Sequence, residues 1–442
     1  MSPEKLRGVS NLTPINPGGV RSILRAKGPL DMKKAITRRE FLQGTAAGAA
    51  AAGLGLYSSA PAGAQALGAN ERINIGVIGC GGMGTGHLRD LMKRSEDAKN
   101  NLAVVGVCDI YEPRKNNAKT ISGAEVYHDY RKMLERRDLT AVVIATPDHW
   151  HAKMALDAMD AGKDVYLQKP MTYTWEEAKQ VAKVCRTKDR VLQVGAQSCS
   201  EDRWWKAGEL IRKGALGKLL WSQSGYSRNS TGGEWNYGID EGANPDNLDW
   251  NAFLGSAPKR PFDKERFFRW RKYWDYSGGI ATDLFYHALS HLQIALGREF
   301  PRRVVASGGI FVQKDREVPD TFFMTIDYPT EHTVVLVSSM ANSQGVPEII
   351  RGHEATMYFE GPGLVIRPED EFRDKRQELS VPQEPRADHM TNFLACVRSR
   401  KTPHLDADTG YKIMTAIDLG VRAYRENRVM EFDPEHERLK SA

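Results

Sequence analysis

Short runs of β-branched residues alternate with amphipathic stretches through the first half of the chain. Runs typical of buried strands are INIGVIG (73–79), AVVGVC (103–108), TAVVIATP (140–147), DVYLQKP (164–170) and RVLQVGAQ (190–197). Helical patterns lie between them, for example in residues 130–139, 151–163 and 175–188. Strands and helices that alternate with short links predict an α/β fold with a doubly wound parallel sheet of the Rossmann type. Ligands of such sheets bind beyond the carboxyl ends of the strands.

The pattern changes after residue 197. A helical segment (204–219) leads into a long irregular stretch (225–255) dense in Gly, Asn and Asp, and then into a segment (257–279) crowded with Arg, Trp and Tyr. Four later runs alternate like strands of an open sheet with one covered face: 302–311, 320–329, 332–340 and 355–368. This half therefore predicts an α+β domain with a large open, mostly antiparallel sheet. We expect three parts: an N-terminal extension (1–70), a nucleotide-binding domain (71–196) and a substrate-binding domain (197–442).

The N-terminal extension has the order of a twin-arginine export signal. The arginine pair of TRREFLQG (37–44) is followed by a stretch without a charged side chain (41–70), in which small residues suit cleavage near Ala64 or Ala66. This Ala- and Gly-rich stretch is too weakly apolar to span a membrane, which takes about 20 strongly apolar residues. The sequence therefore predicts twin-arginine export to the periplasm without a stable membrane span. A lone arginine pair in a basic tail before a linker is the alternative.

Composition narrows the class of protein. The formal charge of +6 belongs partly to the basic residues 1–40, and an ordinary start at Met32 raises the hypothesis that residues 1–31 are not translated. Beyond that segment no basic block suggests nucleic-acid binding. The five cysteines are scattered without a C-x-x-C pair, which argues against a disulfide framework or a zinc cluster. Free thiols suit a protein that folds in the reducing cytoplasm before export.

A glycine loop follows the first strand. Gly79, Gly81 and Gly84 stand in G-x-G-x-x-G order between a strand and a helical pattern, which is typical of dinucleotide-binding enzymes. The first glycine permits a tight turn, the second lets the backbone approach the pyrophosphate, and the third allows close packing of helix and strand. Gly82 and Met83 complete the loop, so that amides at the helix N-terminus face the phosphates.

Other cofactor candidates lie at the carboxyl ends of later strands. Asp109 follows the loop by about 25 residues, where an acidic residue takes the ribose hydroxyls, so it favours NAD. Arg114 can still reach a 2′-phosphate, which leaves NADP open, and a helix N-cap is the alternative role of Asp109. The remaining candidates are Thr146, Pro147, His151, Lys169, Pro170 and Gln197.

These motifs in this order resemble the Gfo/Idh/MocA family of NAD(P)-dependent sugar oxidoreductases. The resemblance rests on the glycine loop, ATPDHWH (145–151), QKP (168–170) and GAQ (195–197), and it covers nearly all of residues 72–434. The family motif is usually Glu-Lys-Pro, with the proline often after a cis peptide, whereas this chain has Gln168. The resemblance implies that the C-terminal helices return to pack on the first domain.

The resemblance implies that Lys169 contacts the nicotinamide ribose and the substrate hydroxyl. A lysine beside the cationic nicotinamide would have a lowered pKa and could take part in proton transfer. A surface lysine before a turn proline is the alternative.

Residues 277–297 carry Asp283, His287 and His291 at intervals of four, so the three side chains are predicted to share one helix face. Asp283 and His287 match the family pattern of two glycines, three residues, Asp, three residues and His. By that resemblance His287 is the general acid/base and Asp283 orients it or binds sugar, whereas simple helix packing is the alternative. Phe285 and Ser290 depart from the family pattern, which leaves the substrate and the reaction open.

The substrate side has further candidates. Trp and Tyr beside Arg suit sugar rings, which have apolar faces and hydroxyl edges, although such residues also serve structural wraps and protein interfaces. The candidates for substrate contact are Arg269, Tyr273, Trp274 and His291. No metal site is expected, because Asp283, His287 and His291 lie along two helical turns and rarely converge on one ion.

Export constrains the reaction. A cofactor loaded in the cytoplasm cannot be exchanged outside, so each turnover must return it to its starting oxidation state. We therefore expect an NAD(P)-dependent oxidoreductase of a sugar or glycoside hydroxyl with a tightly bound, internally recycled cofactor, similar to exported glucose–fructose oxidoreductases. The alternatives are a redox-neutral NAD-dependent glycosidase or lyase that forms a transient keto-sugar, and a non-enzymatic carbohydrate-binding or sensing protein. Expected partners are the sugar, the twin-arginine machinery and a second copy bound through the C-terminal sheet.

Overall fold

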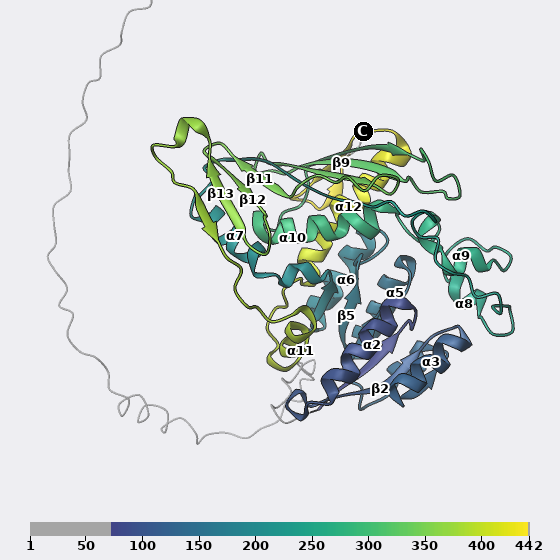
Figure 1. The fold of residues 1–442 in the computed structure, drawn as a ribbon. Helices are drawn as coiled ribbons and strands as arrows, with labels where there is room; N and C mark the ends of the chain where they lie inside the picture. Colours follow the sequence, from purple (N-terminus) through teal and green to yellow (C-terminus); the bar gives the residue numbers. More distant parts are fainter. Residues whose placement is uncertain (1–71, 441–442) are drawn as a thin grey trace, which may run out of the picture. The chain divides into compact units, whose positions relative to one another are not determined.

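The computed structural model describes residues 72–440, which form two β-sheets with helices packed against them (Figure 1). The predicted arginine pair, the cleavage positions near Ala64 and Ala66, and residues 1–31 lie outside the described residues. Within residues 72–440, no helix combines the length and the apolar character needed to cross a membrane.

The first sheet has six parallel strands in the order β3-β2-β1-β4-β5-β6, which confirms the predicted doubly wound sheet. The strands are β1 (Ile73–Ile78), β2 (Leu102–Cys108), β3 (Glu125–Tyr127), β4 (Ala141–Ile144), β5 (Asp164–Gln168) and β6 (Leu192–Gly195). Its helices are α2 (Gly82–Ser95), α3 (Glu112–Ser122), α4 (Tyr130–Leu134), α5 (Asp148–Asp160) and α6 (Trp175–Thr187). Every residue of β1, β4, β5 and β6 is buried, as expected of a parallel sheet covered on both faces.

The second sheet has ten strands in the order β14-β13-β12-β11-β7-β10-β9-β8-β15-β16. Only the pairing of β10 with β7 is parallel, which confirms a mostly antiparallel sheet. The strands are β7 (Leu219–Ser227), β8 (Arg303–Gly309), β9 (Thr321–Asp327), β10 (Thr333–Ser339), β11 (Ile349–Gly352), β12 (Ala355–Tyr358), β13 (Leu364–Pro368), β14 (Leu379–Val381), β15 (Met430–Asp433) and β16 (Arg438–Leu439). Alternate residues of β9 and β10 are buried, so one face of the sheet is covered.

Two expectations for this half are wrong at their boundaries. The helix predicted over 204–219 is α7 (Asp202–Arg212), and the chain from residue 219 onward belongs to β7. The irregular stretch expected from residue 225 begins only after Ser227, where β7 ends. The sequence pattern did not predict β7, because this strand is half-exposed and lacks a continuous apolar run. Within residues 277–297, a π-helical turn (Ala281–Phe285) leads into α10 (Tyr286–Leu296), so Asp283 lies in the turn and His287 and His291 lie in the helix.

The covered face of the large sheet carries α10 and α12 (Ala407–Glu426), as Figure 1 shows. Helix α12 also contacts α6 and β6 of the first sheet. One such contact is the hydrogen bond from the Trp175 amide to Asp418 Oδ2 (3.1 Å), and another is the ion pair of Arg422 with Glu176 (2.7 Å). Helix α11 (His389–Ser399) likewise packs beside the first sheet, where Phe393 forms part of its core.

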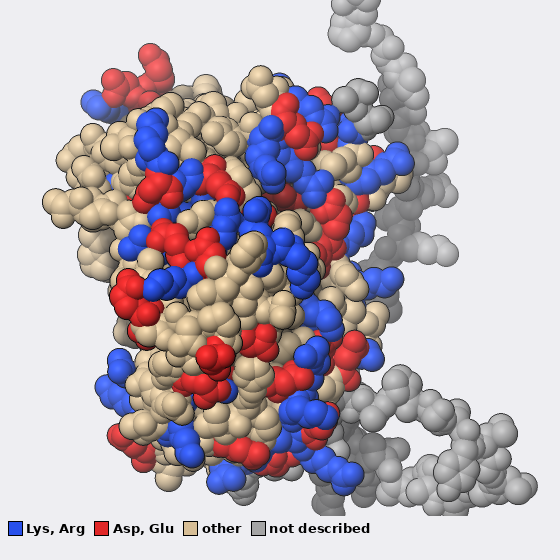
Figure 2. Space-filling model, turned by 90° about the vertical axis from the view of Figure 1, so that its right-hand side faces the viewer, with Lys and Arg blue, Asp and Glu red and all other residues tan. Residues whose placement is uncertain are grey.

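An insertion of little regular structure connects β7 to α10. It contains α8 (Trp250–Leu254), α9 (Lys264–Phe268) and a turn of 3₁₀ helix (Trp270–Lys272). The face of the molecule on this side mixes acidic and basic side chains (Figure 2). Ion pairs within the insertion, such as Arg260 with Asp275 (2.6 Å), account for part of this mixture. The insertion has its own apolar cluster, built around Phe253, Phe267 and Tyr276.

Candidate active site

A cavity of about 770 Å³ lies between the carboxyl ends of the first-sheet strands and the second half of the chain. This is the size range of small-molecule sites, and the carboxyl edge is where such sheets bind ligands. The first sheet supplies one wall, and the end of β7, the insertion and the start of α10 supply the other. The predicted site residues that line the cavity are Gly79, Gly81, Gly82, Met83, Asp109, Arg114, Thr146, Pro147, Lys169, Asp283 and His287.

The glycine loop is sterically obligatory at two positions. Gly79 has φ +84°, and a Cβ there would lie 2.6 Å from the Ala145 carbonyl oxygen. A Cβ on Gly84 would lie 1.7 Å from the Gly79 carbonyl oxygen, although Gly84 itself does not line the cavity. The loop therefore needs glycine for the close packing of α2 on β1, and Gly81 directs the first amides of α2 toward the cavity.

Replacement of Gly84 by Ala is expected to abolish nucleotide binding, because the added methyl group displaces the turn that presents the α2 amides. Gly86 lies on the same helix and provides the matched control, because a methyl group added there would meet no atom within 4 Å. Gly86→Ala should bind nucleotide like wild type and be slightly more stable. Titration of both variants with NAD and NADP, followed by protein fluorescence, checks the difference. Equal affinities in the two variants would contradict the role given to the loop.

Asp109 and Arg114 lie at one end of the cavity. The Asp109 carboxylate accepts hydrogen bonds from the Cys80 amide (2.7 Å) and the Tyr111 amide (2.9 Å), which fixes its orientation beside the glycine loop. Tyr111, not Asp109, is the N-cap residue of α3, so the alternative N-cap role of Asp109 is wrong. Arg114 lies over Gly81, 3.4 Å from a Cβ built there, and none of its hydrogen bonds or ion pairs within residues 72–440 involves a carboxylate.

Lys169 and Asp283 form a buried ion pair at the other end. Lys169 Nζ lies 2.6 Å from Asp283 Oδ1 and also donates to the Asp283 carbonyl oxygen at 2.6 Å. Arg271 Nε lies 3.0 Å from the same carboxylate oxygen, and Trp235 Nε1 donates to the second oxygen at 3.0 Å. One carboxylate therefore fixes two cations and an indole, each from a different segment of the chain.

Burial and charge set the protonation states of this cluster. Burial lowers the pKa of Lys169, and the Asp283 carboxylate opposes that effect. Lys169 and Arg271 outweigh the burial of Asp283 and hold the pKa of its carboxyl well below the usual range. Burial, reinforced by the charge of Lys169, lowers the pKa of His287 to about 3. The imidazole of His287 is thus neutral near pH 7, and its low pKa makes it a weak base while the charged Lys169 lies near it.

The QKP turn is fixed from behind by His151. The Lys169–Pro170 peptide is cis. His151 Nδ1 lies 2.6 Å from the Pro170 carbonyl oxygen and Nε2 lies 2.9 Å from the Thr146 carbonyl oxygen, so the ring joins the ends of β5 and β4. Neither His151 nor Pro170 lines the cavity. Both act on the site through the position they give to Lys169 and Thr146.

Five other predicted residues lie away from the cavity: Gln197, Arg269, Tyr273, Trp274 and His291. Arg269 donates to the Tyr237 carbonyl oxygen (2.8 Å) and pairs with Glu265 (2.9 Å). His291 is 3% exposed, stacks on Trp204, and lies 2.6 Å from Glu348, one turn of α10 beyond His287. The segment 257–279 does reach the cavity, but through Phe267, Phe268, Trp270 and Arg271.

Two residues that the sequence patterns did not single out lie beside or within the site. Asp148, at the start of α5, is 2% exposed, its Oδ2 has no hydrogen-bond partner among residues 72–440, and burial raises its pKa to about 6. Arg228 lines the cavity with its guanidinium 3.6 Å from Asp283, without a side-chain hydrogen bond within the described part of the chain. Asp148 is part of the ATPDHWH motif, so the sequence alone could have identified it as a candidate. Arg228 belongs to no motif, and the sequence gives no signal that would identify it.

No group of three His, Cys, Asp or Glu side chains within residues 72–440 is arranged to hold a metal ion. Asp283 and His287 face the cavity, whereas His291 is engaged with Glu348.

Two domain models of one protein family match successive parts of the chain. Residues 73–196 match the oxidoreductase family with an NAD-binding Rossmann fold, and residues 210–442 match the C-terminal alpha/beta domain of the same family. Residues 35–55 match the signal sequence of the twin-arginine translocation pathway, which indicates export to the periplasm.

Individual relatives cover less of the molecule. An inositol 2-dehydrogenase of Rubrobacter xylanophilus is 32% identical over 151 residues, 34% of this chain and 42% of that protein. A glycosyl hydrolase family 109 protein of Stenotrophomonas maltophilia is 29% identical over 217 residues, 46% of this chain and 45% of that protein. The chain thus spans less than half the length of these relatives. The structure of aldose-aldose oxidoreductase from Caulobacter crescentus covers 82% of this chain and all of its own at a TM-score of 0.62 and 18% identity, which shows a shared fold.

Proposed function

The chain belongs to the Gfo/Idh/MocA oxidoreductase family, and from this membership we propose that it oxidises a hydroxyl of a sugar or glycoside with a tightly held, internally recycled nicotinamide nucleotide. The observation that carries the proposal is the composition of one cavity: a glycine loop at one end and the Lys169–Asp283 pair with His287 at the other. One cavity that holds both groups suits a dinucleotide with its phosphates at the loop and its nicotinamide at the polar cluster, which suits a hydroxyl.

The residues at the loop fit a dinucleotide. Gly84 lets α2 pack against the Gly79 carbonyl oxygen, and Gly81, Gly82 and Met83 at the start of α2 line the cavity, where its N-terminal amides would bind the pyrophosphate. Asp109 keeps acceptor capacity for ribose hydroxyls after its two amide contacts, and this favours NAD. The bound nicotinamide would accept a hydride and later return it.

The catalytic roles follow from the polar residues that line the cavity. We assign the acceptance of the hydroxyl proton to His287, because its imidazole lines the same cavity as Lys169 and is neutral near pH 7. The Lys169 ammonium donates a hydrogen bond to the same hydroxyl oxygen, and Asp283 keeps that ammonium in place. Arg228 has free donors at the cavity wall for the remaining hydroxyls of the sugar. Lys169 and His287 thus act on one hydroxyl oxygen, and Asp283 positions Lys169.

Export supports internal recycling. The twin-arginine signal belongs to a route for folded proteins, so a nucleotide loaded in the cytoplasm would travel with the chain. Two reactions return it to its starting state: oxidation of one sugar with reduction of another, or transient oxidation of a glycoside carbon followed by bond cleavage and reduction. The first reaction is the proposed function, and the second is the alternative. The similarity to a glycosyl hydrolase family 109 protein supports the alternative.

The two reactions give different products, and this tests the proposal. Purified protein without added nucleotide is mixed with a panel of aldoses in pairs, and in parallel with chromogenic aryl glycosides. Oxidation of one sugar with reduction of its partner supports the oxidoreductase, whereas release of the aryl group with deuterium exchange at a ring carbon supports the redox-neutral glycosidase. Sugar binding without turnover on either panel would overturn both and leave a carbohydrate-binding protein.

We further propose that two copies associate through the uncovered face of the large sheet. Trp221 and Phe323 lie on this face of the sheet and are 37% and 39% exposed, and exposed apolar side chains that form a patch mark a contact surface. Trp221→Glu is expected to shift the mass measured by light scattering from oligomer to monomer. The exposed Leu379 on the edge strand β14 is the matched control, since Leu379→Glu should leave the mass unchanged. A monomeric wild type would contradict this interface.

A further inference from the structure

The insertion between β7 and α10 contacts the first sheet at two places. We call residues 237–272 the clamp. Beside β2, the clamp residue Asp240 accepts a hydrogen bond from the Tyr111 hydroxyl (2.5 Å), and the Asp249 amide donates to the Ile110 carbonyl oxygen (3.1 Å). The Glu112 amide donates to the Asn247 carbonyl oxygen (2.9 Å). The clamp therefore holds the three residues that directly follow Asp109.

The second contact lies at the start of α5. The Phe253 carbonyl oxygen of the clamp lies 2.9 Å from His149 Nε2 and accepts a hydrogen bond from Trp150 Nε1 (2.8 Å). Gly255 lies so close to the Trp150 ring that a Cβ would be 2.5 Å from it. The clamp thus reaches from the turn after β2 to the turn after β4 across the carboxyl edge of the sheet.

Between these two contacts the clamp lines the cavity with aromatic side chains. The Arg114 guanidinium lies 4.7 Å from the centre of the Phe267 ring and 5.3 Å from that of Phe268. The Tyr111 ring stands edge-on to both phenylalanines at 5.7 Å. Phe267, Phe268 and Arg114 line the same cavity as Asp109. An aromatic surface beside the acidic residue that faces a ribose is suited to a purine base.

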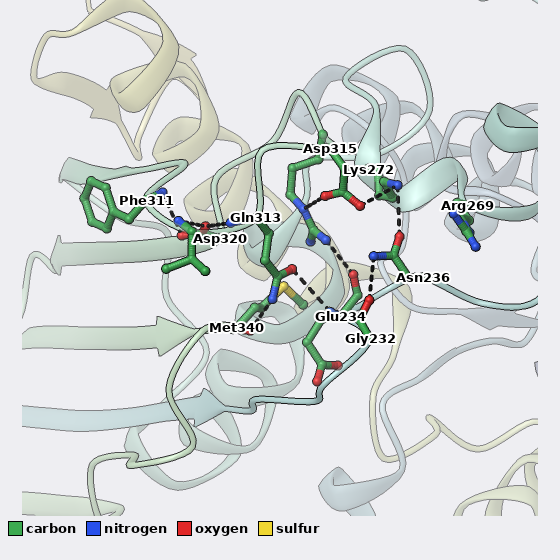
Figure 3. A network of polar contacts seen from close by, with 12 residues as sticks. Gly232, Glu234, Asn236, Arg269, Lys272, Phe311, Gln313, Asp315, Asp320 and Met340 are labelled. Carbon is green, nitrogen blue, oxygen red and sulfur yellow. Dashed lines mark hydrogen bonds and ion pairs between the residues drawn. The ribbon is translucent and has the colours of Figure 1, made fainter.

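The far end of the clamp is fixed to the large-sheet half. Lys272 is 1% exposed, and its ammonium contacts Asn236 (3.0 Å), Glu265 (2.7 Å) and Asp315 (3.0 Å), as Figure 3 shows for Asn236 and Asp315. Asn236 in turn donates to the Gly232 carbonyl oxygen (2.8 Å). A buried ammonium with three acceptors holds the clamp on a rigid support rather than leaving it as a free loop.

We propose that the clamp supplies the adenosine subsite and retains the nucleotide, with Phe267, Phe268 and Arg114 beside the base. Tyr111 is buried and supports the two phenylalanine rings from behind. This inference rests on the proposed use of a nicotinamide nucleotide. Because the clamp is bonded to both halves, the nucleotide leaves only when the contacts at Tyr111, Ile110 and Phe253 open. Retention of this kind provides what a recycled cofactor needs during export, namely release that is slow relative to turnover.

Nucleotide release tests the clamp without reference to activity. Protein loaded with isotopically labelled NAD is diluted into excess unlabelled NAD, and the label that remains bound is followed with time. Tyr111→Phe, which removes the bond to Asp240 but keeps the ring, should release label about 10-fold faster than wild type. Phe268→Ala should release it about 10- to 100-fold faster. Lys264→Ala, which removes only an exposed pair with Glu241 inside the clamp, is the matched control and should release like wild type.

The outcomes distinguish failure of the clamp from failure of the proposed function. Release from Tyr111→Phe and Phe268→Ala at the wild-type rate, with both variants folded by circular dichroism, would overturn the clamp and leave cofactor use intact. Exchange of wild-type label within a single turnover would overturn both the clamp and the internal recycling, and would leave only the use of NAD as an exchangeable cofactor. Protein that takes up no NAD or NADP even after refolding in their presence would overturn the proposed function itself.

Discussion

Lys169→Met is expected to lower turnover by about 1000-fold or more while leaving the fold and nucleotide binding in place. The ammonium donates to Asp283 and lines the cavity together with His287, and methionine keeps most of the side-chain length without the charge. The loss should fall on kcat, because Lys169 acts on the reacting hydroxyl rather than on the rest of the sugar. Measurement of kcat and KM with the substrate found in the paired-sugar panel checks this expectation.

Lys163 provides the matched control for that variant. Its side chain is also buried, and its ammonium donates to the carbonyl oxygens of Arg136 (2.7 Å) and Leu139 (3.0 Å), away from the cavity. Lys163→Met should lower stability by about 1 to 3 kcal/mol, because two buried acceptors lose their donor, with kcat unchanged. If Lys169→Met kept a wild-type kcat, the proposed catalytic site would be wrong even if the nucleotide were bound.

Asp283→Asn is expected to lower both turnover and stability. The neutral amide leaves Lys169 and Arg271 without their shared counter-charge, and breaking a buried ion pair costs about 3 kcal/mol or more. Turnover falls because Lys169 is no longer held toward His287. Denaturant unfolding measures the first effect and single-turnover kinetics of the folded protein the second.

The pH dependence of stability adds a check on Asp283. Its pKa in the folded protein lies below the usual value of 3.8, so its contribution to stability is complete above about pH 4. That contribution is lost as the pH falls through the folded pKa. The stability difference between wild type and Asp283→Asn should therefore be constant from pH 5 to 8 and shrink below about pH 4.

Asp164→Asn separates structural from catalytic loss. Asp164 is buried and pairs with Arg400 (2.5 Å), and neither residue lines the cavity. Asp164→Asn should lose stability much as Asp283→Asn does, but its kcat per folded molecule should remain that of the wild type. A loss of kcat of the same size in Asp164→Asn and Asp283→Asn would mean that Asp283 acts only as a structural ion pair.

The hydrophobic pattern was sufficient for the first sheet. Each of its longer strands is a run of mostly apolar residues, as expected of parallel strands buried on both faces. Strand β3 has only three residues, of which Glu125 is exposed, and escapes that criterion. Strand β7 has exposed or half-exposed positions such as Trp221 and Gln223, and it pairs with β10 and β11 that lie far away in the sequence. Its place depends on tertiary pairing, which periodicity does not encode.

The sequence placed those candidate residues correctly at the cavity that belong to a motif and directly follow a strand. Gly79, Asp109 and Lys169 directly follow strands, so the sheet itself places them at the cavity. The aromatic segment 257–279 has no regular structure that would tell which side chains turn inward, and Trp270 and Arg271 do so instead of Tyr273 and Trp274. The spacing of four that joins Asp283 and His287 continues to His291, but the next turn of α10 already faces Glu348.

The proposed function depends most directly on a nucleotide carried inside the folded protein. The protein is purified without added nucleotide and denatured, and the polypeptide is then removed. The small molecules that were released are identified and quantified by mass spectrometry. We predict about one NAD per chain, in the same total amount before and after turnover. Protein that contains no nicotinamide nucleotide and turns over only with added NAD or NADP would contradict a closed redox cycle.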